Sequence, residues 1–167
     1  MNHYIIKKDN ILFYYDEDLN RGLVVAQEDI GNAPWGCHGF NVNGLDSSIG
    51  SGLNNSFLIT QQCDETPNAA QLCLEYESNG YSDWYLPSYE ELLLMWSSVG
   101  QGSHNIGNVS NFSDGAYWSS NEMGANYGNC LYFSSPSPSD YVTSNGKGSL
   151  FFVRPIRSFG NWNLTMG

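Results

Sequence analysis

The sequence predicts an α+β fold on three observations. Near the N-terminus, two apolar runs flank a polar stretch that ends in Arg-Gly, a pattern typical of a β-hairpin. The middle of the chain then changes to the helical spacing of apolar residues, twice in succession. The remainder carries aromatic residues among Ser, Asn and Gly and closes on a run rich in strand-favouring residues. The last strand can therefore return beside the first hairpin, with the helices grouped between them.

Size and charge narrow the class of protein. The chain has 167 residues, the length of one domain, and we expect residues 1–167 to form a single domain with a core over 11–159 and a short tail over 160–167. It carries 17 acidic and 6 basic residues, a net charge of -11 that repels phosphate backbones and anionic membranes. Nucleic acid is therefore not an expected partner. No apolar run has the length of a membrane span or a signal peptide, so neither membrane insertion nor export is expected.

The first 62 residues divide into a hairpin and a loop. Apolar runs over Ile11–Tyr15 and Gly22–Ala26 flank a polar turn over Asp16–Arg21, which predicts two paired strands. Residues 27–62 show no sustained period, and their stretch "SIGSGLNNSF" is punctuated by glycine. We expect an ordered loop there, because glycine lets backbone segments approach closely.

Two helices are predicted next. Thr66 is expected to cap the first helix, with Pro67 in its first turn and Gly80 at its end. The second helix is expected to begin with a capping box made by Ser88 and Glu91. The apolar faces at helical spacing are Ala69, Leu72, Cys73 and Tyr76 in the first helix and Leu92, Met95, Trp96 and Val99 in the second.

The region from residue 97 to residue 149 is rich in small polar residues. Ser, Asn and Gly supply 28 of its 53 residues, yet aromatic residues recur throughout. A disordered linker would lack those aromatic residues, so short strands joined by ordered loops are predicted. The run "SLFFVRPIRSF" that follows predicts the closing strand.

The cysteines and histidines predict no metal site. Cys37, Cys63, Cys73 and Cys130 follow neither the spacing of a metal knuckle nor that of a dense disulfide framework. We expect reduced thiols in the core, because free cysteine is usually buried, with a Cys63–Cys73 bridge as the alternative. The 3 histidines lie far apart and form no ligand motif.

The order of six short segments resembles the Lcl C-terminal domain family, which is named after a bacterial collagen-like adhesin. The resemblance covers nearly the whole chain from Ile11 to Phe159. The segments come in the family's order, so the set is far more specific than any one of them. They are "GLVVA" (22–26), "SIGSG" (48–52), "AAQLC" (69–73), "GYSDWYLPSYEEL" (80–92), "YWSSNE" (117–122) and "VRPIRSF" (153–159).

The resemblance implies a C-type-lectin-like fold, similar to that of formylglycine-generating enzymes. In such a fold two helices pack on a small, mostly antiparallel sheet, the terminal strands are paired, and the loops are long and ordered. The chain departs from better-known relatives: "TPN" at Thr66–Asn68 lacks the first carboxyl ligand of the lectin calcium site, and no "WND" occurs. The formylglycine enzymes need a cysteine pair late in the chain, whereas only Cys130 lies there. No metal, cofactor or catalytic activity is therefore expected.

Asp83, Glu90 and Glu91 are the carboxylates best grouped for acid/base chemistry. A framework role is favoured instead, because Glu91 belongs to the capping box and Glu90 suits the positive end of the helix dipole. Asp83 has a plausible ion-pair partner in Arg154 or Arg157 of the closing strand. The residues expected to frame the fold are Asp83, Trp84, Pro87, Glu91, Trp118, Arg154 and Arg157.

The Ser-, Asn- and Tyr-rich region is the candidate binding surface. Antibody paratopes use a similar composition, because Tyr offers a large amphipathic contact and Ser and Asn adapt their hydrogen bonds. Each of its aromatic residues could alternatively belong to the core of a short strand. The residues predicted to bind a ligand are Tyr127, Asn129, Tyr132, Tyr141 and Asn145.

The function predicted from these features is recognition without catalysis. We expect an adhesion module that binds carbohydrate or another surface, and the resemblance favours a phage virion component such as a tail-fibre tip or a head-decoration protein. Its expected partners are a glycan or protein surface and other subunits of a virion-like assembly. The expected location is the virion, or the host cytoplasm before assembly. The alternative is a purely structural assembly protein that binds no small ligand, and an enzyme is the least favoured class.

Overall fold

The fold is α+β, with a few helices packed on antiparallel and mixed sheets. The computed structural model describes residues 6–7, 10–134 and 144–162. None of the helices in these ranges is long and apolar enough to cross a bilayer. The elements in chain order are β1 (Ile6–Lys7), β2 (Asn10–Asp16), β3 (Arg21–Val25), β4 (Asn32–Ala33), α1 (Gly52–Gln62), α2 (Ala69–Leu74), α3 (Tyr89–Val99), β5 (Gly115–Glu122), β6 (Tyr127–Phe133), β7 (Ser144–Gly146), β8 (Phe151–Phe152) and β9 (Ile156–Gly160).

The first sheet joins the two ends of the described chain. Its strand order is β1-β2-β3-β9, and all its pairs are antiparallel. The predicted hairpin is confirmed as β2 and β3, with Ile11 opposite Val25 and Asp16 opposite Arg21. The closing strand β9 lies beside β3, with Val25 opposite Ile156. The predicted pairing of the N-terminal hairpin with the last strand is therefore confirmed.

The second sheet has the order β4-β8-β5-β6-β7, in which only β5 and β8 are parallel. The fold therefore has two sheets where one was predicted. The single predicted closing strand is also wrong, because the chain leaves β8 of the second sheet at Phe152 and enters β9 of the first at Ile156. Pro155 lies in this crossing, and proline cannot donate a ladder hydrogen bond.

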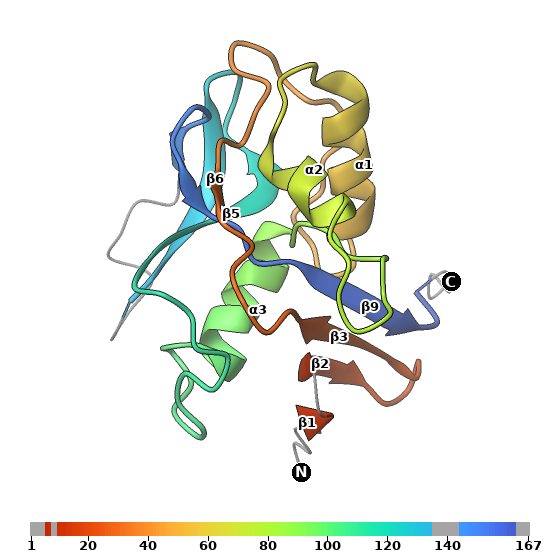
Figure 1. The fold of residues 1–167 in the computed structure, drawn as a ribbon. Helices are drawn as coiled ribbons and strands as arrows, with labels where there is room; N and C mark the ends of the chain where they lie inside the picture. Colours follow the sequence, from red (N-terminus) through yellow and green to blue (C-terminus); the bar gives the residue numbers. More distant parts are fainter. Residues whose placement is uncertain (1–5, 8–9, 135–143, 163–167) are drawn as a thin grey trace.

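Helix α3 lies between the two sheets (Figure 1). The predicted capping box is present: the Ser88 hydroxyl accepts a hydrogen bond from the Glu91 N–H, and the Glu91 carboxylate accepts one from the Ser88 N–H. The buried face of the helix, which includes Leu92 and Met95, packs in one core with inward-facing residues of both sheets. The predicted second helix is therefore confirmed, and it joins the two sheets.

Helix α1 occupies a segment for which a loop was predicted. Its buried residues are Gly52, Asn55, Ser56 and Ile59, spaced as one helical face. The helical period exists, but three of its four positions are small or polar, so a search for apolar periodicity missed it. The polar members are satisfied internally; for example, the Ser56 hydroxyl donates to the Gly52 carbonyl at 2.8 Å.

Helix α2 is shorter than predicted and begins later. Asn68, rather than Thr66, is the N-cap, and its side-chain oxygen accepts the Gln71 N–H at 2.9 Å. The helix ends at Leu74, well before Gly80. Helices α1 and α2 cover the face of the second sheet that carries Trp118, while Tyr117 on the opposite face belongs to the core around α3. The strand β5 is therefore covered on both sides.

Candidate functional site

The three carboxylates singled out in the sequence do not form an acid/base cluster. Asp83 pairs with Arg157 through two hydrogen bonds of 2.7 and 3.0 Å, which lowers the pKa of its carboxyl. The expected ion pair is thus present, and Arg157 rather than Arg154 is the partner. Glu90 is exposed in the first turn of α3, whereas Glu91 is fully buried.

Glu91 is held by backbone donors. Its two carboxylate oxygens accept the Gly50 N–H at 2.8 Å and the Ser88 N–H at 2.7 Å. Burial raises the pKa of the carboxyl to about 7 in spite of these hydrogen bonds, which favour the charged form. Because a side chain on Gly52 would collide with the same carboxylate, the start of α1 depends on this close approach. Glu91 therefore joins α3 to α1 and has no open face for chemistry.

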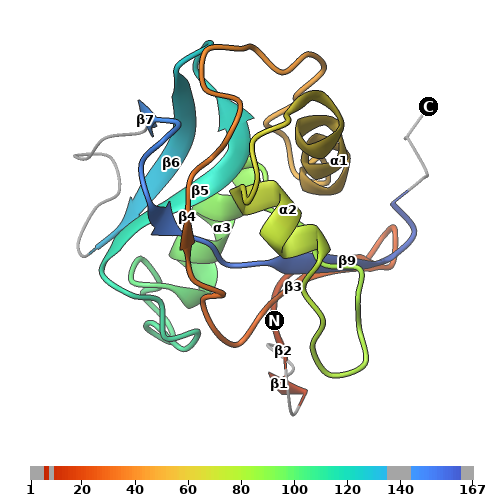
Figure 2. The same ribbon diagram turned by 45° about the horizontal axis from the view of Figure 1, so that its top comes forward.

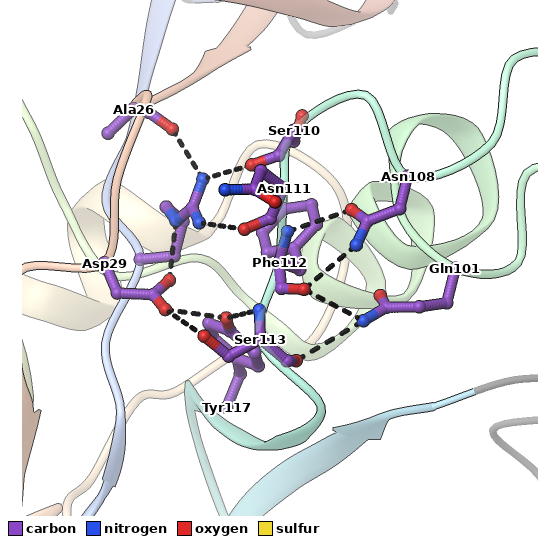
Figure 3. A network of polar contacts seen from close by, with 10 residues as sticks. Ala26, Asp29, Gln101, Asn108, Ser110, Asn111, Phe112, Ser113 and Tyr117 are labelled. Carbon is purple, nitrogen blue, oxygen red and sulfur yellow. Dashed lines mark hydrogen bonds and ion pairs between the residues drawn. The ribbon is translucent and has the colours of Figure 1, made fainter.

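Arg154, the other predicted framework arginine, is almost completely buried. The polar residues around it, among them Asp29, Ser110 and Tyr117, form a hydrogen-bonded cluster (Figure 3). The Nε atom of Arg154 donates to Asp29 at 2.8 Å, and its Nη1 donates to the carbonyls of Ala26 and Ser110 at 2.9 and 3.0 Å. Its guanidinium also lies 4.5 Å from the ring centroid of Phe112. The arginine therefore joins the segment after β3 to the loop between α3 and β5.

A second layer of side chains completes this cluster (Figure 3). The Tyr117 hydroxyl donates to Asp29 at 2.9 Å and accepts the Ser113 N–H at 2.8 Å. Burial, together with the Asp29 charge, raises the pKa of Tyr117 to about 12, so its hydroxyl stays protonated. The Asn108 amide makes two hydrogen bonds, both of 2.9 Å, with the backbone of Phe112. These hydrogen bonds close the loop on itself.

Lys147 forms a second buried cluster, which the sequence did not predict. The residue is fully buried, and its Nζ donates to Glu122 at 2.6 Å and to the Phe40 carbonyl at 2.7 Å. It also lies 4.5 Å from the ring centroid of Trp35. The other Glu122 oxygen accepts the Val42 N–H at 2.8 Å. One ion pair therefore holds the loop over residues 37–43 against the end of β5.

A disulfide between Cys37 and Cys63 ties the same loop to the end of α1. The prediction of four reduced thiols is wrong for this pair, and the alternative Cys63–Cys73 bridge is wrong as well. Cys73 and Cys130 are buried thiols, as expected, and burial raises the pKa of both. The pairing depends on a turn in which Gly36, Cys37 and Gly39 all have positive φ, a conformation that no spacing rule reveals.

Three segments meet at this end of the second sheet, and we call them together the rim: residues 37–43, 123–127 and 144–149. Figures 1 and 2 both show them together. The Gly39 N–H donates to the Ala125 carbonyl, and the Lys147 N–H donates to the Asn126 carbonyl, each at 2.9 Å. Three rim side chains are more than half exposed: Phe40 at 71%, Met123 at 58% and Tyr127 at 54%. The rim therefore displays large apolar side chains on a backbone fixed from beneath.

The predicted ligand-binding residues divide between this rim and the rest of the sheet. Tyr127 and Asn145 belong to the rim, and the amide oxygen of Asn145 accepts the Ser149 hydroxyl at 2.8 Å. Asn129 lies two residues after Tyr127 in β6, opposite Ser144. Tyr132 lies opposite Ala116 toward the far end of β6, and its odd separation from Tyr127 directs it to the other face. Tyr141 lies outside the described residues.

Phe40, Met123 and the Lys147–Glu122 pair are the features of the rim that sequence reasoning missed. The signals for two of them were present in the sequence. Phe40 is an aromatic residue within "GCHGFNVNG", and Lys147 is an isolated lysine flanked by glycines in "SNGKGS". A lone charged residue in a loop of small neutral residues needs a partner if the loop folds down on it.

Two shallow hollows occur outside the rim, one of about 290 Å³ beside α1 and α2 and one of about 310 Å³ over residues 77–82. No group of three or more His, Cys, Asp or Glu side chains in the described part of the chain is arranged to hold a metal ion. No protein-family model matches the chain, and no curated protein matches it significantly.

Proposed function

We propose that this protein is a non-catalytic recognition module that binds a carbohydrate or another surface through the rim. The observation that carries the proposal is the exposure of Phe40, Met123 and Tyr127 on a backbone held by a buried ion pair and a disulfide. Exposed apolar side chains that cluster on a soluble protein mark interaction sites. A surface that is already ordered loses little conformational entropy when it binds, and this favours affinity.

We further propose that the fold is C-type-lectin-like, as the resemblance to the Lcl C-terminal domain family implies. The pairing of β3 with β9 and the long ordered loops support this assignment. The third helix and the second sheet exceed what the resemblance implies. An adhesion setting, such as a tail-fibre tip or head decoration on a phage, remains part of the proposal because it rests on the same resemblance.

A structural role in an assembly is the second candidate, and one observation favours it. The outer face of the first sheet carries Tyr15 and Phe159, whose rings stack at 6.3 Å and are 46% and 36% exposed. Nearby, Arg157 lies 3.7 Å from the ring centroid of Tyr81, which is 44% exposed. A neighbouring subunit could cover this face while the rim binds nothing.

Paired variants of the two surfaces separate these functions. Binding of the labelled protein to a glycan array and to bacterial cells is measured for the wild type, for Phe40→Ala with Tyr127→Ala, and for Tyr15→Ala with Phe159→Ala. The proposal expects a signal that the rim variant loses and the sheet variant keeps. Loss of the signal only in the sheet variant, or its survival in the rim variant, would contradict it. Near-native melting temperatures of both variants serve as the folding control.

A further inference from the structure

We infer that the ligand of the rim is an uncharged glycan, recognised without any ion pair. This inference rests on the proposed function and narrows its ligand from a carbohydrate or another surface to one chemical class. It depends on how the charged side chains of the chain are distributed and partnered.

The basic side chains that the structure describes are already engaged in ion pairs. The chain has 6 Lys and Arg residues, and the structure describes the side chains of four, Lys7 and Lys8 being the exceptions. Each of the four is bonded to its own carboxylate. Sulfate, phosphate and carboxylate groups are recognised mainly by arginine and lysine, which pair with them through charge-assisted hydrogen bonds. The described rim exposes neither an arginine nor a lysine, because its single lysine, Lys147, is fully buried.

Acidic side chains are also missing from the rim. The segments 37–43, 123–127 and 144–149 contain none of the 17 Asp and Glu residues of the chain. Glu122, directly before the second segment, is bonded to Lys147 and to the Val42 N–H. A cationic ligand would therefore find no available carboxylate there, and the net charge of -11 would repel an anionic one from a distance. The rim is a neutral surface on an acidic protein.

The neutral groups of the rim suit a sugar better than an apolar protein surface. The exposed asparagines Asn41, Asn43 and Asn126 lie next to or near Phe40 and Tyr127 in the sequence of the rim segments. An amide both donates and accepts, which matches a hydroxyl group, and an aromatic side chain offers an apolar face beside it. A protein-binding patch would instead have contiguous apolar side chains at its centre. The mixture of aromatic rings and amides in these segments therefore favours a hydroxyl-rich ligand with apolar faces.

The experiment measures affinity for soluble polysaccharides at low and high salt. The probes are dextran, yeast mannan and a galactan as neutral polymers, and heparin and alginate as anionic ones. We expect the wild type to bind at least one neutral polymer, with a dissociation constant that changes less than about twofold with salt. Phe40→Ala with Tyr127→Ala should weaken binding by about tenfold or more. Tyr15→Ala with Phe159→Ala should leave the affinity unchanged.

Three outcomes would overturn the inference, and they separate it from the proposed function. Binding to heparin or alginate that weakens steeply with salt would show an anion site. Binding to protein-coated surfaces or particles that depends on the rim, without affinity for any polysaccharide, would contradict the inference of a glycan ligand. The proposed function as a recognition module would still stand. Binding of a neutral polymer that survives the rim substitutions would overturn both.

Discussion

Two buried cations support two loops, and these loops differ in how far they expose large side chains to solvent. Arg154 and Lys147 each bond a single carboxylate, at least two backbone carbonyls and the face of an aromatic ring. The loop over Arg154 exposes Ile106 and Val109 at 36% and 41%. The rim over Lys147 exposes Phe40 at 71% and is also tied by a disulfide.

The comparison separates the ordering of a loop from the exposure of its side chains. Both clusters satisfy the backbone of a Gly- and Asn-rich loop, which cannot bury enough apolar surface to stay ordered alone. In the loop over Arg154, the aromatic residue Phe112 packs in the core. The rim directs Phe40 outward instead. The same kind of buried ion pair therefore holds a loop whose aromatic residue is buried in one place and a loop whose aromatic residue is exposed in the other.

The largest expected effect is the loss of either buried cation. Lys147→Ala and Arg154→Ala each leave a carboxylate and several carbonyls without their donor, so each should lower the free energy of unfolding by about 3–5 kcal/mol in urea denaturation. Only the Lys147 variant should also weaken binding through the rim, measured where enough folded protein remains. Equal loss of binding in both variants would remove the distinction between the two loops.

A double variant tests whether the ion pair couples Lys147 and Glu122. Lys147→Met with Glu122→Gln removes both charges but keeps the stem of the lysine and an oxygen that can accept the Val42 N–H. Replacement of a buried ion pair by neutral groups is often nearly neutral, so the double variant should be more stable than Lys147→Met alone. An additive loss of stability would mean that the ion pair does not couple the two residues.

Removal of the disulfide is the next largest expected effect. Cys37 and Cys63 are separated by 26 residues, and Cys37→Ser with Cys63→Ser should cost about 3 kcal/mol by the loss of the cross-link from the unfolded chain. Thermal unfolding of the variant and of the chemically reduced wild type should agree. The control Cys73→Ala removes a buried sulfur but no cross-link, and it should cost less. An equally large loss of stability in Cys73→Ala would mean that core packing, and not the cross-link, causes the effect.

The buried Glu91 should make stability fall as pH rises. Its pKa increases from an ordinary value of 4.5 to about 7, so within this window the folded state keeps a proton that the unfolded state has released. The free energy of unfolding should therefore decrease with pH, by up to about 1.4 kcal/mol per pH unit, and level off above the window. Denaturant unfolding at a series of pH values should show this slope removed by Glu91→Gln and kept by Glu90→Gln. A slope that survives Glu91→Gln would assign it to other groups.

The smallest expected effect is at the exposed ion pair. The Asp83 side chain is 54% exposed, so solvent screens its attraction to Arg157. Asp83→Asn should cost less than about 1 kcal/mol at neutral pH. Because the Asp83 pKa is lowered in the folded state, its contribution should disappear as pH falls through that pKa. A loss comparable to that of Arg154→Ala would contradict the contrast between exposed and buried pairs.

The sequence predicts those parts of the fold that depend on the spacing of apolar residues and on helix-capping residues. The β2–β3 hairpin and helix α3 with its capping box follow such local signals, whereas the pairing of the last strand with the hairpin was expected from the family resemblance. Helix α1 was missed because its buried face is largely polar. The rim was missed because it is assembled from three distant segments by Lys147, whose partners lie 25 and 107 residues away in the chain. Tyr127 was predicted because a tyrosine among Asn and Gly is itself a local signal.

Hydrogen exchange in the Lys147→Met variant tests most directly whether the buried lysine fixes the rim. The amides to follow are those of Gly39 and Val42, which donate across the rim, with the Tyr85 amide beside β9 as the distant control. We predict that protection at Gly39 and Val42 falls at least about tenfold more than at Tyr85, because the loop loses its anchor while the first sheet does not. A uniform change at all three amides would mean that the rim is ordered without Lys147, and would contradict the central claim.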